Sequence, residues 1–135
     1  MRLLRALPVI ALFALVPAVA PSATPTWEPA TAASVTAYAE HSDFRIDAYI
    51  SAPNACYSAR VRTALGSSGR TFFIEQMKSA TATACSPSPY HCSVVSGPIA
   101  LPIPQSITVS SANKNWKVHV MTGEHPSPMT PMCKS

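Results

Sequence analysis

The feature that most constrains this chain is a repeated alternation of apolar and polar side chains with a period of two residues. Residues 44–50 read FRIDAYI, so that Phe44, Ile46 and Ile50 fall on one side. Successive side chains of a β-strand point to opposite faces, and this period is therefore typical of a half-buried strand. No segment keeps the three- and four-residue spacing of an amphipathic helix, and the sequence predicts none. The alternation recurs, clearly or weakly, over residues 34–40, 57–65, 70–78, 81–85, 92–96, 105–111 and 115–122.

Turn-forming residues separate these segments and predict the architecture. Short strands, about seven in all, with turn signals between them are typical of an all-β fold, and we expect a small antiparallel β-sandwich. The stretch GSSG at residues 66–69 predicts a hairpin, because its two glycines supply turn conformations. In that hairpin Leu65 lies opposite Arg70, and Arg60 lies opposite Glu75.

The N-terminal residues predict export. Residues 1–5 read MRLLR, and a short apolar run interrupted by prolines and then small residues follow. These are the parts of a secretory signal peptide, which we assign to residues 1–22. The apolar run is too short to span a bilayer, so we expect no membrane span after cleavage. No cysteine lies near the cleavage region, and we expect a secreted or periplasmic protein without a lipid anchor.

Composition divides the remainder into three parts. Residues 23–33 are rich in proline, threonine and alanine, and we expect an extended linker in which Trp27 is the one residue that could dock. We assign residues 34–123 to the β-sandwich domain and residues 124–135 to a C-terminal tail rich in proline and methionine. The length that remains after signal removal, roughly 110 residues, suits one domain with a modest core.

The charge balance argues against nucleic-acid binding. The net charge is +4, but two of the positive charges, Arg2 and Arg5, belong to the signal peptide. The mature chain keeps eight basic and six acidic residues, and its basic residues form no run. The sequence therefore lacks the basic patch of a nucleic-acid-binding protein.

The cysteines predict two disulfides, because four of them lie in the exported part of the chain: Cys56, Cys85, Cys92 and Cys133. One arrangement joins Cys56 to Cys85 across the ends of the hairpin and leaves Cys92 for Cys133. Another joins Cys85 to Cys92 and leaves Cys56 for Cys133. We favour the first, although loop closure alone does not separate them. A metal site is the rival interpretation, but no pair has the spacing Cys-x-x-Cys.

One candidate contact surface is the side of the hairpin that carries the arginines. Cross-strand pairing of Arg60 with Glu75, and of Arg62 with Phe73, is typical of an ordinary solvated sheet face. The patch Arg60, Arg62, Phe73, Glu75 and Met77 is nevertheless a candidate contact surface, because exposed aromatic residues on a sheet can mark one.

A second candidate is the loop CSPSPYHC at residues 85–92. Prolines stiffen it, and a stiff loop loses little conformational entropy when it docks. Its Pro87, Pro89, Tyr90 and His91 form a possible binding loop, and presentation of this loop as a protease inhibitor is one alternative function. The plain interpretation is a connection that disulfides protect from proteolysis.

The third candidate is the C-terminal tail, which is rich in soft metal ligands. Met121, His125, Met129 and Met132 carry thioether and imidazole groups, which suit copper, and a periplasmic copper carrier is a further alternative. We expect no metal site and no cofactor, because these ligands lack a tight cluster.

No motif predicts catalysis. The chain has no Gly-x-Ser-x-Gly elbow, no His-Glu-x-x-His and no glycine-rich phosphate loop. We expect a protein that is not an enzyme, and keep a small hydrolase only as a weaker alternative.

A resemblance narrows the fold further. The order of PNACY, an alternating strand, TFFIEQM, ATAC and a proline-rich connection with two further strands resembles small exported bacterial domains of immunoglobulin-like β-sandwich architecture. The resemblance covers residues 34–122 and implies a Cys56–Cys85 disulfide. Because such folds host unrelated functions, we expect only a non-catalytic binding or envelope accessory protein, whose partner is another protein or an envelope component. The oligomeric state is left open.

Overall fold

The structure is a computed structural model that describes residues 24–67, 69–81, 84–100 and 102–135. The expected signal peptide, residues 1–22, lies outside the described residues. In the described ranges every regular element is a strand, and no helix there is long and apolar enough to cross a membrane. The strands are β1 (Glu28–Pro29), β2 (Thr31–Glu40), β3 (Asp43–Ala52), β4 (Tyr57–Gly66), β5 (Gly69–Lys78), β6 (Tyr90–Val95), β7 (Ile99–Ala100), β8 (Ser106–Ser110) and β9 (Asn115–Thr122).

These nine strands form one mixed sheet with the order β1-β5-β8-β9-β2-β3-β6, in which β4 also pairs with β5 and β7 with β3. The expectation of a purely antiparallel arrangement is therefore wrong: β5 pairs with β8, and β2 with β9, in parallel. Period-two burial reports which faces are buried but not the direction of neighbouring strands.

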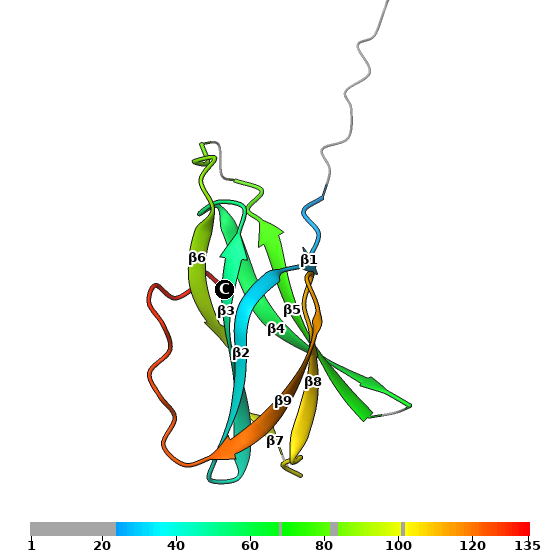
Figure 1. The fold of residues 1–135 in the computed structure, drawn as a ribbon. Coiled ribbons are helices and arrows are strands. Elements are labelled where there is room, and N and C mark those ends of the chain that lie inside the picture. Colours follow the sequence, from blue (N-terminus) through cyan, green and yellow to red (C-terminus); the bar gives the residue numbers. More distant parts are fainter. Residues whose placement is uncertain (1–23, 68, 82–83, 101) are drawn as a thin grey trace, which may run out of the picture.

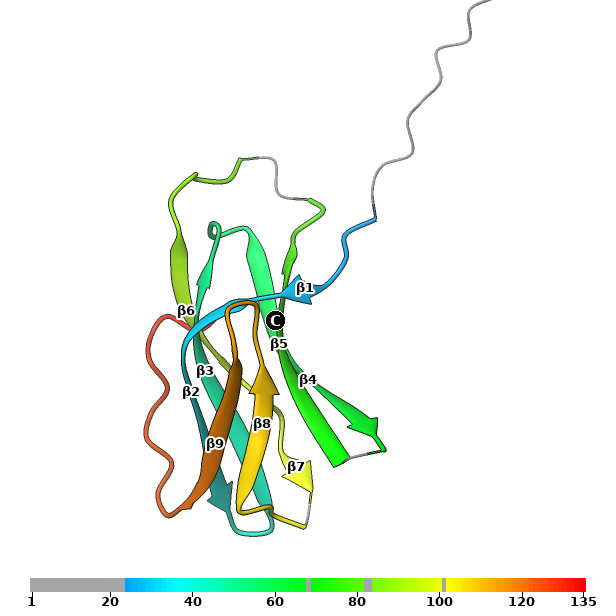
Figure 2. The same ribbon diagram turned by 45° about the vertical axis from the view of Figure 1, so that its right-hand side comes forward.

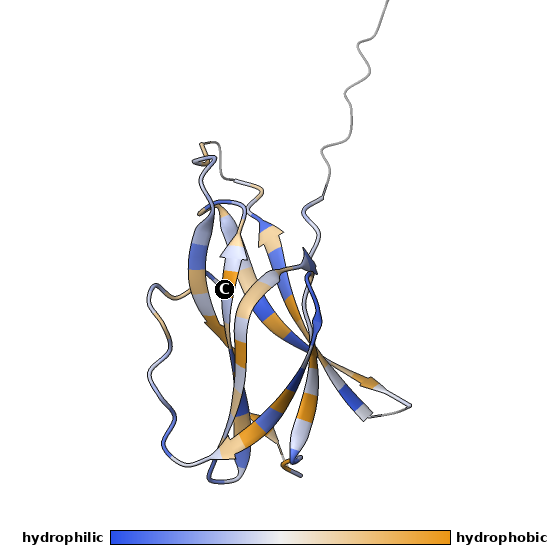
Figure 3. Cartoon of the chain, in the orientation of Figure 1, coloured by the Kyte–Doolittle hydropathy of each residue, from blue (hydrophilic) through white to orange (hydrophobic). Residues whose placement is uncertain are grey.

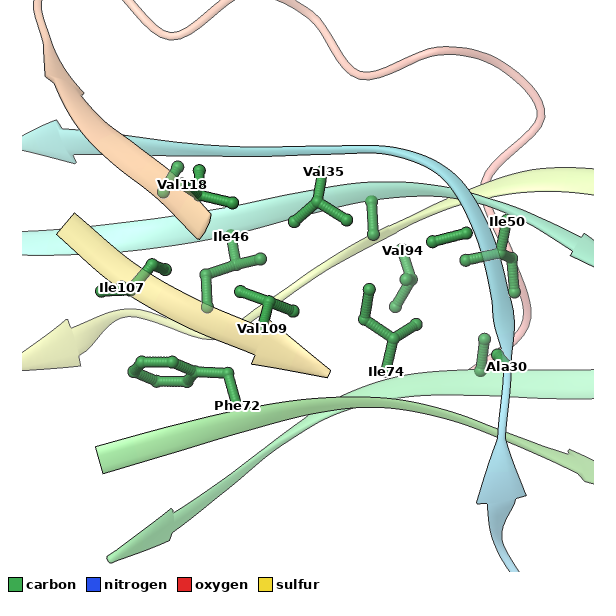
Figure 4. Close-up of a cluster of buried hydrophobic side chains, with 14 of the residues drawn as sticks. Ala30, Val35, Ile46, Ile50, Phe72, Ile74, Val94, Ile107, Val109 and Val118 are labelled. Carbon is green, nitrogen blue, oxygen red and sulfur yellow. The ribbon is translucent and has the colours of Figure 1, made fainter. Parts of the chain in front are cut away.

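The sheet folds over, so that β2, β3 and β6 face β4, β5 and β8 (Figures 1 and 2). Strand β9 links the two halves, because its first part pairs with β8 and its end pairs with β2. Apolar and polar residues alternate along the strands (Figure 3). The apolar ones meet between the halves, among them Val35, Ile46 and Ile74 (Figure 4). The rings of Phe44 and Phe72 pack edge to face in this core, with centroids 5.9 Å apart.

The sheet begins earlier than the expected domain start at residue 34. Within the segment expected to be a linker, β1 pairs with β5 and β2 begins at Thr31, and both Ala30 and Ala32 are buried. The side-chain amide of Asn113 binds the backbone of β2 at Ala32 through two hydrogen bonds, as a residue of a neighbouring strand would. Its Oδ1 accepts from the Ala32 N–H at 3.1 Å, and its Nδ2 donates to the Ala32 carbonyl at 2.9 Å. Alanine buries too little apolar surface to make this strand visible in the sequence.

The end of the chain is bound to the body. We call residues 131–134 the C-terminal strap. The Ser93 N–H of β6 donates to the Pro131 carbonyl at 2.9 Å, and the Cys133 N–H donates back to the Ser93 carbonyl at 2.8 Å. On the other side, the Ala59 N–H of β4 donates to the Lys134 carbonyl at 2.8 Å. The strap thus joins the edges of β4 and β6, at the end of the proline- and methionine-rich tail assigned to residues 124–135.

Two disulfides fix these connections. Cys56 pairs with Cys85 across the outer ends of β4 and β5, and Cys92 of β6 pairs with Cys133 of the strap. This is the arrangement favoured from the sequence. Two disulfides are typical of proteins that fold in an oxidising compartment outside the cytoplasm.

Candidate functional site

The strongest candidate site lies on the outer face of the β4–β5 hairpin. The hairpin has the register expected from the sequence, with Arg60 opposite Glu75 and Arg62 opposite Phe73. Alternation sends these four side chains outward, while their strand neighbours, among them Ile74, point into the core. The pattern of the sequence therefore places the group on one surface.

Glu75 organises the two arginines. Its Oε2 accepts from the Arg60 Nε at 2.9 Å and lies 2.8 Å from an Arg60 terminal nitrogen. Its Oε1 accepts from the Arg62 Nε at 2.8 Å. The Glu75 side chain is only 12% exposed, whereas the arginine side chains are 41% and 40% exposed. A largely buried carboxylate requires charged partners, and here both oxygens have one.

An aromatic ring lies against each guanidinium. The Arg60 guanidinium carbon lies 4.0 Å from the ring centroid of Trp27, and that of Arg62 lies 4.4 Å from the centroid of Phe73. Both distances are within the range of cation–π attraction. We call Trp27, Arg60, Arg62, Phe73 and Glu75 the arginine cluster. Every guanidinium in it is held by a carboxylate at its edge and a ring at its face.

A hollow of about 290 Å³ adjoins the cluster. Arg62, Phe73 and Glu75 form one side of it, and Pro29 and Ser110 help to form the other. Arg62 gives the rim of this hollow a positive charge. Its terminal amino groups have no hydrogen-bond acceptor among the residues that the structure describes. Chemically, this surface can take an acceptor at Arg62 and a small side chain in the hollow.

Two residues show the limits of the sequence prediction for this surface. Met77, part of the predicted patch, lies opposite Ser58 and is half-buried, but it makes none of the arginine contacts. Trp27, which the sequence placed in a linker, completes the cluster. An isolated tryptophan in a polar, proline-rich segment was the available signal.

The predicted binding loop is anchored at each end by a different disulfide. Cys85 is bonded to Cys56, and Cys92 to Cys133. Pro87 and Pro89 are exposed between them. Tyr90 and His91, in contrast, belong to β6: Tyr90 packs against the core, and the His91 ring stacks on Tyr49 at 6.0 Å. These two residues therefore belong to the sheet and not to the tip of the loop.

The four soft ligands of the C-terminal part lie along its path over the sheet. Met121 lies opposite Tyr38, and the His125 ring packs edge-on against Tyr38 with centroids 4.7 Å apart. Met129 borders a cavity of about 240 Å³ with Asp47, while Met132 lies in the strap beside β6. The pKa of Asp47 lies above its ordinary value. Burial raises it by more than the Coulombic effect of the nearby His125 lowers it.

No three histidine, cysteine, aspartate or glutamate side chains come together as a metal site in the described part of the chain. Cys133 is held in a disulfide and supplies no thiolate. The structure brings the arginine cluster together as one surface. Of the candidate metal ligands, Met121 and His125 lie beside Tyr38, Met129 lines a cavity that Tyr38 also lines, and Met132 lies beside β6. No protein-family model, no curated protein and no solved structure matches this chain.

Proposed function

We propose that this chain is an exported, non-catalytic binding domain of immunoglobulin-like β-sandwich architecture, which engages a partner protein through the arginine cluster. Export is supported by the composition of residues 1–22 and by the two disulfides. The sandwich architecture is supported by the two facing halves of the sheet and the core between them (Figure 4).

The observation that carries the proposal is the way Glu75 and the two rings hold Arg60 and Arg62. Arginine and tryptophan are enriched among the residues that dominate protein interfaces. Side chains that are already fixed lose less conformational entropy on binding than free ones. Arg60 and Arg62 are thus ordered before a partner arrives, yet keep about 40% of their side-chain surface in solvent.

The charge of the cluster specifies the partner. Two guanidinium groups face one carboxylate. Lys117 of β9, opposite Thr108 of β8, also lies on the outer face of this half of the sheet. A partner that presents carboxylates at its surface would complement this charge, and an apolar side chain beside them would fill the hollow at Phe73. Such complementarity raises the rate of association and fixes orientation.

The experiment is site-specific photo-crosslinking in cells that naturally export the protein. A photoreactive residue replaces Met77, next to the cluster, or Arg45, an exposed residue of β3 on the far half of the sheet. We expect one discrete adduct from position 77 and none from position 45. The adduct should disappear when Arg62→Ala is added.

The control for Arg62→Ala is Lys114→Ala, which removes a positive charge that lies over Trp116 and outside the cluster. It should leave the adduct unchanged. Equal adducts from positions 77 and 45, or an adduct that survives Arg62→Ala, would assign binding to another surface.

The loop between the disulfides supports a second candidate, a protease inhibitor. Its favourable feature is the anchoring of both ends, by Cys85 and Cys92, to different parts of the body. A loop so held would resist release after cleavage. Incubation with serine and cysteine proteases should then give a stoichiometric complex that is lost in Pro87→Gly/Pro89→Gly, and turnover of the chain as an ordinary substrate would exclude the idea.

A further inference from the structure

Among the residues that the structure describes, none forms a strand along most of the outer edge of β4. On one side β4 pairs with β5 from Tyr57 to Gly66. On the other side the strap reaches only Ser58 and Ala59. The Ala59 N–H points to the strap, and alternation turns the backbone groups of Val61, Thr63 and Leu65 the same way. In the ranges described, nothing pairs with this edge beyond Ala59.

The same stretch carries the most exposed large apolar side chain of the described residues. Leu65 is 81% exposed, and Thr63 beside it on the same face is also exposed. The hairpin extends away from the rest of the sheet at this point (Figures 1 and 2). Proteins protect free edges with proline, bulges, charged side chains on the edge strand or inward-pointing charges. Residues 60–65 of β4 contain no proline and pair with β5 without a bulge, and both of their arginines are paired with Glu75.

We propose that two copies of this chain associate through the β4 edges as an antiparallel pair, with Thr63 opposite the partner's Thr63 on a two-fold axis. Val61 then lies opposite the partner's Leu65, and Leu65 opposite the partner's Val61. About six backbone hydrogen bonds would join the two strands. Because the interface is isologous, it closes as a dimer and does not propagate.

The side chains select this register. Only residues whose backbone groups point outward can form the hydrogen-bonded pairs, which restricts the choices to shifts of two residues. A shift toward the N-terminus places Arg62 opposite the partner's Arg62 or Arg60, and like charges directly opposite are destabilising. A shift toward the C-terminus places Leu65 opposite the partner's Thr63. The proposed register pairs Leu65 with an apolar residue twice and sets Arg62 opposite Ala64 of the partner subunit.

The dimer does not depend on the proposed function. If both hold, the two arginine clusters lie on one continuous outer surface, since the hairpins share a face across the axis. The strap stays in place, because the pairing ends at Val61 and leaves Ala59 bonded to Lys134.

The test is the mass of the mature protein by sedimentation and light scattering between about 5 and 500 µM, the range for a weak strand-edge dimer. We expect a dimer at the upper end that dissociates on dilution. Leu65→Lys should raise the dimer dissociation constant at least tenfold, since it replaces the apolar partner of Val61 with a charged side chain in both pairs. Thr63→Pro should do the same without breaking the hairpin, because the Thr63 N–H points away from β5.

The control is Thr108→Lys, which adds the same charge at an exposed site of β8 and should leave the dissociation constant unchanged. For the register, Thr63→Cys should form a covalent dimer on mild oxidation much faster than Arg62→Cys. Circular dichroism should confirm that each variant is folded. A monomer throughout the concentration range, an unchanged dimer in Leu65→Lys, or equal crosslinking of the two cysteine variants would overturn the proposal.

Discussion

Replacement of Glu75 by alanine should expose how the arginine cluster is held. Breaking a fully buried ion pair costs about 3–5 kcal/mol, and an exposed pair contributes about 0–1 kcal/mol. The Glu75 side chain is 12% exposed, but its partners Arg60 and Arg62 are 41% and 40% exposed, so water screens much of each interaction. We therefore expect about 1 kcal/mol for each arginine and a loss of about 2 kcal/mol in the free energy of unfolding for Glu75→Ala.

A double-mutant cycle measured by urea unfolding separates the pair from other effects of the substitutions. Arg62→Ala, Glu75→Ala and the double variant should give a coupling energy of about 1 kcal/mol that falls as salt is added. The matched cycle of Arg62 with Glu124, an exposed residue of the C-terminal part, should give none. A coupling energy for Arg62 and Glu75 below about 0.3 kcal/mol would refute the claim that the carboxylate fixes the guanidinium.

Three further predictions concern the frame that carries the cluster. Cys92→Ala/Cys133→Ala should lower the free energy of unfolding by about 4 kcal/mol, because that disulfide spans 41 residues. Cys56→Ala/Cys85→Ala, which removes a disulfide that spans 29 residues, should cost less. An equal or greater loss would contradict the claim that the disulfide of the strap contributes more to stability. Burial raises the pKa of Asp47 in the folded protein, so its charge destabilises the fold and stability falls as the pH rises through that raised value. Asp47→Asn should thus raise the Tm at pH about 7 and change it little near pH 3, whereas a lower Tm at neutral pH would contradict this sign. Asn113→Ala should cost about 1–2 kcal/mol in urea unfolding, because two hydrogen bonds to Ala32 are lost, and Asn115→Ala should cost less.

The alternation of the sequence predicted what depends on burial alone. An all-β fold and the β4–β5 register follow from which side chains need a core, as in Val61 opposite Ile74. The outward placement of the arginines follows from the same period. The direction of β8 and β9 could not be predicted in this way, because parallel and antiparallel neighbours bury their side chains alike.

The sequence pattern also failed to predict elements that lack large apolar residues. Ala30, between β1 and β2, and Ala32, near the start of β2, are buried, but their small side chains give little periodic signal. The Cys92–Cys133 disulfide of the strap was favoured from the sequence, but the backbone hydrogen bonds that hold the strap to β4 and β6 leave no pattern in the side chains around Cys133. Trp27 lies against Arg60 next to β1, which pairs with β5. Its place in the cluster could not be predicted, because the composition of this segment indicated a linker and not a strand.

Residue-resolved amide hydrogen exchange is the most direct test of the frame that positions the hairpin. In dilute protein, the amides of Ala59, Ser93 and Cys133 should exchange slowly because each donates to the strap or its partner strand, while those of Val61 and Thr63 should exchange fast. Reduction of the Cys92–Cys133 disulfide should make Ala59 and Ser93 fast as well. Free exchange of Ala59 and Ser93 in the oxidised protein would contradict the position of the strap. Protection of Val61 and Thr63 in the dilute monomer would contradict the open β4 edge.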